Sequence, residues 1–241
     1  MNKIIMFVLV GIASLYFVKT DQNNVPEIKN TERMPMLGQA IDQELAEFSK
    51  LVHRTKADTS VSEMFPTIPE NRYPDIFRAY PDFVSDGFDF PVGVPNARNY
   101  YKAQNFGDNR HLGEDWNGRG GGNTDLGDPV YSVGNGLVTF SKDVCCGWGK
   151  TVRIVHHLPN HPEHQYVESV YAHLHTMDIT VGSLVKRGQR IGTIGNANGR
   201  YNAHLHLEMR NFINMSLGPG YGDDQFGYLV PTNFIQSNRP Y

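Results

Sequence analysis

The chain has 241 residues, of which 39% are hydrophobic and 20% are charged. This composition excludes global disorder and leaves room for one good-sized core with a shorter appendage. A formal net charge of −3 offers no basic surface, so no nucleic-acid partner is expected. The 24 glycines and 14 prolines indicate many turns and favour a mainly β fold.

An uncharged apolar run, IIMFVLVGIASLYFV, occupies residues 4–18 and follows Lys3. It is shorter than the roughly 20 residues of a membrane-spanning helix and is typical of the core of a secretory signal. The small residues of a cleavage site are poorly arranged around Val18 and Thr20, so an uncleaved membrane anchor stays an open alternative. Residues 1–20 therefore predict export to the periplasm or the cell surface.

The next segment, residues 21–87, forms a helical and irregular N-terminal region. Apolar residues recur there at spacings of three and four, which predicts one amphipathic helix. The stripe consists of Leu37, Ile41, Leu45, Phe48 and Val52. Such a helix docks on a neighbouring domain or belongs to a pro-segment. Six prolines follow between residues 65 and 95 and predict an irregular connection that follows the surface.

From about residue 100 the pattern changes to short β-runs with glycine between them. The run 129–141 contains Gly-Asn-Gly and predicts a hairpin. Further strands are expected at 151–157, 165–174 and 204–210, with short strands in 179–195 that break at Gly182 and Gly188. We expect an antiparallel β-sandwich or barrel-like catalytic domain over residues 88–241.

Two histidines in the last strand carry the first functional signal. His204 and His206 are two residues apart, so in a strand they project from one face, while Leu205 and Leu207 enter the core on the other. An isolated pair of this kind is more typical of an exposed strand face than of a metal site. Partners elsewhere in the chain are needed before it indicates a metal.

The segment HLGED, residues 111–115, offers such partners. Imidazole and carboxylate groups are good zinc ligands, and Gly113 permits a tight backbone path between His111 and Asp115. With one histidine of the later pair they make three protein ligands, the number that a catalytic zinc uses. The alternative is a surface loop with a solvated charge.

A third histidine segment is VYAHLH, residues 170–175. Alternation places His173 and His175 on one face and Ala172 and Leu174 on the other. A histidine beside a zinc-bound water can transfer a proton or stabilise an oxyanion. Four further histidines between HLGED and VYAHLH, His156, His157, His161 and His164, match no motif and are interpreted as surface or strand residues. The adjacent pair Cys145 and Cys146 is interpreted as structural or incidental, and a vicinal disulfide in an oxidising compartment stays an open alternative.

Together the segments HLGED, YAHLH and HLHLE, in this order on a glycine-rich β-domain, resemble the lysostaphin/LytM-type zinc metallopeptidases. The resemblance covers residues 88–236 and implies the duplicated hybrid motif fold of that family. It implies a Zn²⁺ cofactor with His111, Asp115 and His206 as ligands. It also implies that His173 and His204 are catalytic histidines that do not bind the metal.

The function implied by this resemblance is zinc-dependent hydrolysis of peptide bonds in bacterial peptidoglycan, by an exported monomer with an optional N-terminal membrane anchor. His204 would act as base and His173 would bind the oxyanion, or the reverse. Alternatives are a non-catalytic or latent member that regulates another cell-wall hydrolase, a peptidase of proteins, and a structural zinc domain. Because all five positions are filled, activity is favoured. His175 and the long loop 116–128 depart from the family pattern and leave the cleaved bond open.

Overall fold

The computed structural model describes residues 67–144 and 147–240. The predicted signal, the helical stripe at 37–52 and the cysteine pair lie outside these residues. Within them the fold is mainly β, and every pair of neighbouring strands is antiparallel. The sheets are open and sandwich-like, which confirms the predicted antiparallel class without a closed barrel.

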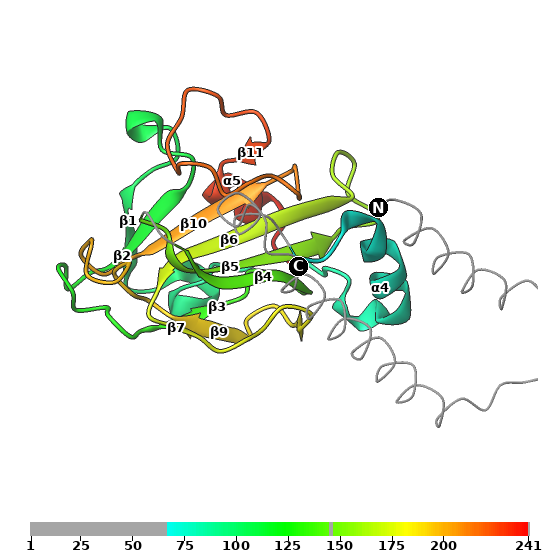
Figure 1. The fold of residues 1–241 in the computed structure, drawn as a ribbon, viewed down its shortest axis with the longest axis horizontal. Coiled ribbons are helices and arrows are strands. Elements are labelled where there is room, and N and C mark those ends of the chain that lie inside the picture. The colour runs from blue at the N-terminus through cyan, green and yellow to red at the C-terminus, as the bar shows by residue number, and fades with distance from the viewer. Residues whose placement is uncertain (1–66, 145–146, 241) are drawn as a thin grey trace, which may run out of the picture. The chain divides into compact units, whose positions relative to one another are not determined.

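The larger sheet has eight strands and forms the body of the domain (Figure 1). In spatial order its strands are β1 (Tyr100–Gln104), β2 (Glu114–Gly118), β10 (Leu205–Arg210), β6 (Tyr166–Leu174), β5 (Gly149–His157), β4 (Gly136–Val144) and β8 (Leu184–Val185), and β11 (Tyr228–Leu229) pairs with β10. The predicted strands 151–157, 165–174 and 204–210 correspond to β5, β6 and β10 and are confirmed.

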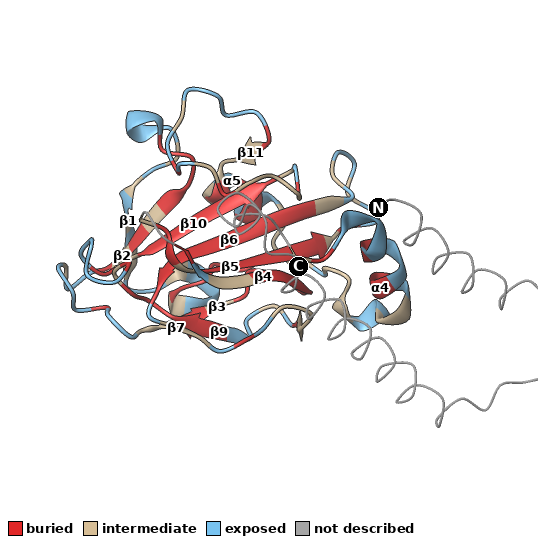
Figure 2. Cartoon of the chain, in the orientation of Figure 1, coloured by how far each residue is buried: buried red, intermediate tan, exposed pale blue. Residues whose placement is uncertain are grey.

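A second sheet has three strands, in the order β3 (Pro129–Tyr131), β9 (Arg190–Thr193) and β7 (Thr176–Met177). Side chains from both sheets form one apolar core, which includes Val130 and Ile191 from the small sheet and Val152, Ile154 and Leu207 from the large one. The central strands are buried along most of their length (Figure 2), because both faces of the large sheet are covered.

The predicted hairpin over residues 129–141 is wrong. Its two halves, β3 and β4, belong to different sheets, since β3 pairs with β9 while β4 pairs with β5 and β8. A Cβ on Gly136 would lie 2.5 Å from the carbonyl oxygen of Val155, so the glycine lets β4 start close against β5. The glycine-rich turn therefore carries the chain from one sheet to the other.

The described part of the N-terminal region is ordered on the outer face of the large sheet. It contains η1 (Glu70–Arg72), α4 (Tyr73–Ala79) and η2 (Pro81–Phe83). The expected irregular connection therefore holds a short helix, whose residues Tyr73, Ile76 and Phe77 are buried against Leu137 and Val155.

The remaining short elements are η3 (Gly93–Ala97), η4 (Asp108–Arg110) and α5 (Pro231–Ser237). Two residues of α5, Phe234 and Ile235, join the core between the sheets. None of the helices in the described part of the chain combines the length and the apolar character needed to cross a membrane.

Candidate metal centre

Strand β10 separates a core face from a polar face, as its alternating sequence predicts. Leu205, Leu207 and Met209 are fully buried in the core between the sheets. His206 points from the opposite face, and its register partner on β2 is Asp115. Directly opposite residues of an antiparallel pair lie on the same face, so the pairing alone brings this imidazole and this carboxylate together.

The segment that precedes β2 completes the cluster. His111 is fully buried and forms an isolated bridge with Tyr221. Gly113 lies so close to β10 that a Cβ there would meet His206 Cε1 at 2.7 Å and Glu208 Cγ at 2.9 Å. The missing side chain therefore allows the segment 111–115 to lie against His206 and Glu208, two of the buried polar residues of β10.

Three donor atoms converge in this cluster. His206 Nδ1 lies 3.0 Å from His111 Nε2 and 3.0 Å from Asp115 Oδ1, and His111 Nε2 lies 3.4 Å from the same oxygen. Two ligand atoms that hold zinc at about 2.1 Å with tetrahedral angles are about 3.4 Å apart. The donor types and their spacing therefore fit a zinc ion. Among the described residues this is the only group of three metal-ligating side chains found within reach of one ion.

The electrostatics of the cluster favour a positive charge at its centre. Burial opposes the ionisation of Asp115, but its hydrogen bonds with His111 and His206 outweigh burial and hold its pKa well below the usual range. Burial likewise lowers the pKa of His206, yet hydrogen bonds to Asp115 and Glu208 raise it to about 9. The carboxylates of Asp115 and Glu208 thus flank His206 on two sides, and their negative charge favours a cation beside the ring.

His173 reaches the site through a break in strand alternation. Its backbone has a φ of 62°, a left-handed conformation that is uncommon outside glycine and concentrates at functional sites. The β5–β6 register shifts at this point, and Ala172 and Leu174 pack in different clusters. The prediction that these two residues share a face is therefore wrong. His175, expected beside His173, is exposed and does not line the site.

Both predicted catalytic histidines stand beside the cluster. The ring of His173 lies 4.7 Å from that of His204 and 5.5 Å from that of His206, measured between centroids. His173 Nδ1 donates to the carbonyl of Trp148 at 3.1 Å, and His204 Nδ1 donates to the carbonyl of Asn202 at 2.8 Å. A carbonyl can only accept, so each neutral ring has its lone pair on Nε2.

The protonation of His173 is set mainly by its surroundings. Burial, followed by the charges of His206 and His204, lowers its pKa to about 3. The ring is therefore neutral at physiological pH and can accept a proton on Nε2. His204 Nε2 lies 3.8 Å from Asp115 Oδ1, which places the second ring at the edge of the same cluster.

A cavity of about 300 Å³ opens onto this cluster. It is bordered by side chains that the sequence analysis did not assign to the site: Gln104, Trp148, Tyr201 and Tyr221. They come from separate loops and strand ends with no common period. The nearest signal in the sequence is a glycine beside two of the aromatic residues, in Gly147-Trp148 and Gly220-Tyr221.

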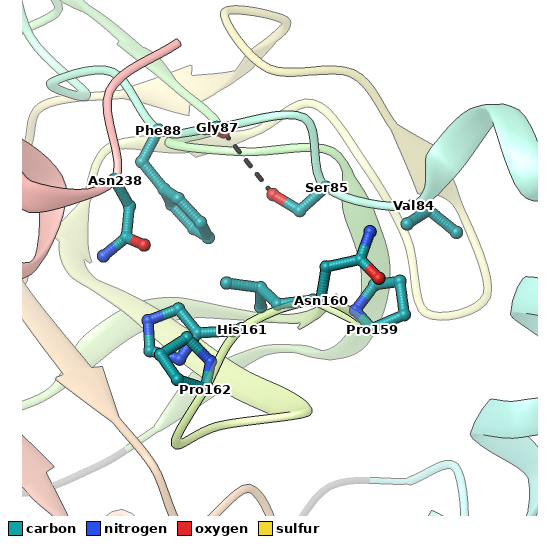
Figure 3. A pocket seen from close by; sticks show the side chains of 10 residues that line it. Val84, Ser85, Gly87, Phe88, Pro159, Asn160, His161, Pro162 and Asn238 are labelled. Atoms are coloured by element: carbon teal, nitrogen blue, oxygen red, sulfur yellow. Dashed lines mark hydrogen bonds between the residues drawn. The ribbon is translucent and has the colours of Figure 1, made fainter.

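A second cavity of about 310 Å³ lies between residues 84–88 and the turn 158–162 (Figure 3). Its imidazole, His161, uses Nδ1 to accept hydrogen bonds from the backbone N–H groups of Glu163 and His164. None of the predicted site residues lines this second cavity. Of the predicted residues, Asp115, His173, His204 and His206 line the first cavity.

Comparison with known proteins gives matches over the same region. The model of peptidase family M23 matches residues 110–218, which hold all five predicted site residues. Lipoprotein NlpD of Yersinia enterocolitica is 32% identical over 84 residues, which cover 35% of this chain and 78% of that protein. An uncharacterized lipoprotein, YgeR of Escherichia coli strain K12, is also 32% identical over 84 residues, but these cover only 30% of its length.

Solved structures similar to the chain include two peptidases. Lysostaphin from Staphylococcus simulans is 22% identical with a TM-score of 0.43, over 58% of this chain and 50% of its own. A zinc containing peptidase from Vibrio cholerae is 25% identical with a TM-score of 0.40, over 57% of this chain and 40% of its own. The match thus spans half or less of either peptidase chain.

Proposed function

Because the chain belongs to peptidase family M23, we propose that it is a zinc-dependent endopeptidase that hydrolyses peptide bonds in bacterial peptidoglycan. The observation that supports this most strongly is the convergence of three buried ligand atoms, spaced for one ion, beside two further histidines. A structural zinc site would have no use for the two extra imidazoles.

His111, Asp115 and His206 are the proposed ligands of the zinc ion. When bound, zinc supplies a Lewis acid and lowers the pKa of a water molecule to about 7. The protein residues hold the ion in place and transfer protons. The buried carboxylate of Asp115 offsets part of the charge of the ion, and the strand pairing of β2 with β10 holds two ligands in place.

His173 and His204 are the proposed catalytic residues. Each presents the Nε2 lone pair, so each ring can accept the proton of an attacking water. The ring that accepts it can then donate to the leaving amine or to the developing oxyanion. The lowered pKa keeps the ring of His173 neutral at physiological pH, so its Nε2 lone pair is free to accept a hydrogen bond from that water.

The cavity beside the histidines is the proposed binding site for the substrate peptide. Its lining residues include three aromatic side chains, Trp148, Tyr201 and Tyr221, and no Lys or Arg among the described residues. Such a surface suits an uncharged stretch of peptide. Gly147 and Gly220 also line this cavity, and a Cβ on Gly147 would lie only 2.7 Å from the hydroxyl oxygen of Tyr201.

The proposed setting is the cell envelope. Both curated relatives carry the name lipoprotein, and the apolar run at residues 4–18 suits an export signal or an anchor. We propose residues 1–20 as that signal, 21–87 as an N-terminal region and 88–241 as the peptidase domain. Residues 67–87 of the N-terminal region add α4 to the outer face of the domain.

The test is digestion of purified peptidoglycan with mass spectrometry of the released peptides. Wild type is compared with His206→Ala and with a sample stripped by a chelator. Release of defined fragments by wild type alone, restored in the stripped sample by added zinc, would support the peptidase. A folded, zinc-loaded wild type that releases nothing from several wall types would favour a non-catalytic regulator of another hydrolase.

A further inference from the structure

The polar face of β10 continues beyond the metal ligand as a buried row of charged side chains. Glu208 and Arg210 follow His206 at two-residue steps, and both are fully buried. Arg210 lies opposite Glu168 on β6, which is also fully buried. Burying an unpaired charge costs several kcal/mol. Each charged side chain of this row is therefore expected to have partners of opposite charge or hydrogen-bonding partners.

Glu208 uses its two carboxylate oxygens for different partners. Oε1 accepts a hydrogen bond from His206 Nε2 at 3.1 Å. Oε2 accepts from Arg210 Nε at 2.8 Å and from Arg210 Nη2 at 2.5 Å. A carboxylate only accepts, so Nε2 of His206 carries the hydrogen. Nδ1 likewise donates to the carboxylate of Asp115, at 3.0 Å. A metal ion bound at Nδ1 would replace that hydrogen, while the hydrogen held by Glu208 would stay on Nε2.

Arg210 is itself fixed by hydrogen bonds to backbone carbonyls, so it stays beside Glu208. Its Nη1 donates to the carbonyl of Ser216 at 3.1 Å and its Nη2 donates to that of Leu217 at 2.9 Å. Arg153, from β5, donates to Glu168 at 2.6 Å and to the carbonyl of Met215 at 2.7 Å. The two arginines therefore hold the segment 215–217, which leads directly into the cavity residues Pro219, Gly220 and Tyr221.

We infer that Glu208, clamped by Arg210, is a positioning residue of the metal centre: it fixes the tautomer and orientation of His206 so that Nδ1 faces the ion. This inference rests on the proposed zinc site. A carboxylate behind a metal-binding histidine commonly fixes the ring in this way, and its loss typically weakens metal binding about 10- to 100-fold.

The substitution Glu208→Gln tests this with almost no change in shape. The amide has one acceptor oxygen and one donor nitrogen. If the oxygen faces His206, the NH₂ group faces the guanidinium of Arg210, which is also a donor. If the amide turns over, its NH₂ group requires a lone pair on Nε2 and moves the ring proton to Nδ1. Either arrangement disfavours a metal ion at Nδ1.

A matched control lies on the adjacent strand. Glu114 is fully buried, and its register partner is Leu207. It accepts from Lys102 Nζ at 3.3 Å and from Thr232 Oγ1 at 2.7 Å. Glu114→Gln therefore makes the same chemical change at the same burial without touching a proposed ligand.

Zinc affinity is measured by competition with a chromophoric chelator for full-length wild type, Glu208→Gln and Glu114→Gln, after circular dichroism shows that each is folded. We expect about 10- to 100-fold weaker zinc binding in Glu208→Gln and wild-type affinity in Glu114→Gln. Equal weakening in both variants, or no weakening in Glu208→Gln, would overturn the inference while leaving the zinc site intact. A wild type that binds no zinc would instead refute the proposed function.

A second readout needs no variant and covers the case in which Glu208→Gln does not fold. Nitrogen-15 NMR of the His206 ring in zinc-loaded wild type should show the hydrogen on Nε2 and the metal-induced shift on Nδ1. A metal-induced shift on Nε2 would contradict the inference.

Discussion

At the scale of single residues, the site depends on places where two segments approach closely. Gly113 is the sharpest case, because the backbone of the segment 111–115 lies against His206 and Glu208 with no space for a side chain. The glycine thereby sets the distance between the first two proposed ligands and the third. Its role is steric, since no positive φ is recorded for it.

We predict that Gly113→Ala weakens both the fold and the metal site. The new methyl group would lie 2.6 Å from the carbonyl oxygen of Leu207 and 2.7 Å from His206 Cε1, which forces β10 away from the segment. Overpacking of this kind typically costs about 1–3 kcal/mol. Urea unfolding and zinc titration measure the two effects. Gly222→Ala is the control, since its Cβ would make only an ordinary contact of 3.5 Å with Leu112.

A second prediction concerns His156, which is fully buried outside the metal centre. Its Nδ1 donates to the carbonyl of Asn135 and its Nε2 lies 2.7 Å from Ser169 Oγ. Burial lowers its pKa to about 4, below the usual value near 6.5. The unfolded chain therefore binds more protons between these values, so the stability that this group contributes is complete above about pH 6.5 and falls as the pH drops toward 4.

The shift corresponds to about 3 kcal/mol of unfolding free energy. His156→Gln should flatten that part of the pH dependence, as measured by urea unfolding between pH 4 and pH 7. His175→Gln, at an exposed position, should keep the wild-type slope. A wild-type slope in His156→Gln would show that other groups cause it.

Strand alternation and the His-x-x-x-Asp spacing are local features, so they identified His111, Asp115 and the pair His204 and His206 as candidate ligands. The choice of His206 as the third ligand came from the resemblance to the family. The structure brings together the predicted His111, Asp115 and His206. The sequence could not predict that Ala172 and Leu174 pack in different clusters, because the break in alternation at His173 depends on the register between β5 and β6. The sequence also could not predict that Trp148, Tyr201 and Tyr221 line one cavity, because these residues come together only in the folded chain.

At the scale of elements, the strands were predictable and their partners less so. Periodicity identified β5, β6 and β10, but the glycine-rich turn at 134–136 looks the same whether it closes a hairpin or leads to another sheet. The β3–β9 and β4–β8 pairings decide between the two, and they join residues distant in sequence. Local patterns therefore predicted the long central strands. They did not predict β1, β2, β7 or β11, and the expected loop 116–128 begins inside β2. The topology depends on long-range contacts.

Helix α4 leads to the third prediction. Phe77 is buried and its ring lies 5.3 Å from that of His157 and 6.2 Å from that of Tyr166. Phe77→Ala should destabilise the domain by about 3 kcal/mol, measured as the free energy of unfolding in urea. Arg78→Ala on the same helix removes only an exposed ion pair with Asp75. It should cost well under about 1 kcal/mol, and equal losses would show that α4 contributes nothing through burial.

At the scale of the whole molecule, the large sheet contributes one face to the apolar core and the other face to the candidate metal centre. Its inner face packs on the small sheet, while β10 and β2 place His206 and Asp115 on the other face. The segment 215–221 covers that face through bonds to Arg153, Arg210, Trp148 and His111. Two of the three proposed ligands, Asp115 and His206, therefore lie on paired strands, which favours a fixed geometry, while His111 is held by its bridge with Tyr221.

The most direct test of this account is the rate of peptide release from peptidoglycan per bound zinc ion, compared between wild type and His173→Ala at full zinc occupancy. The account predicts unchanged zinc content and a rate lower by about 10²- to 10⁴-fold, because general acid–base catalysis is lost while the three ligands remain. An equal rate per zinc ion in the two proteins would contradict it.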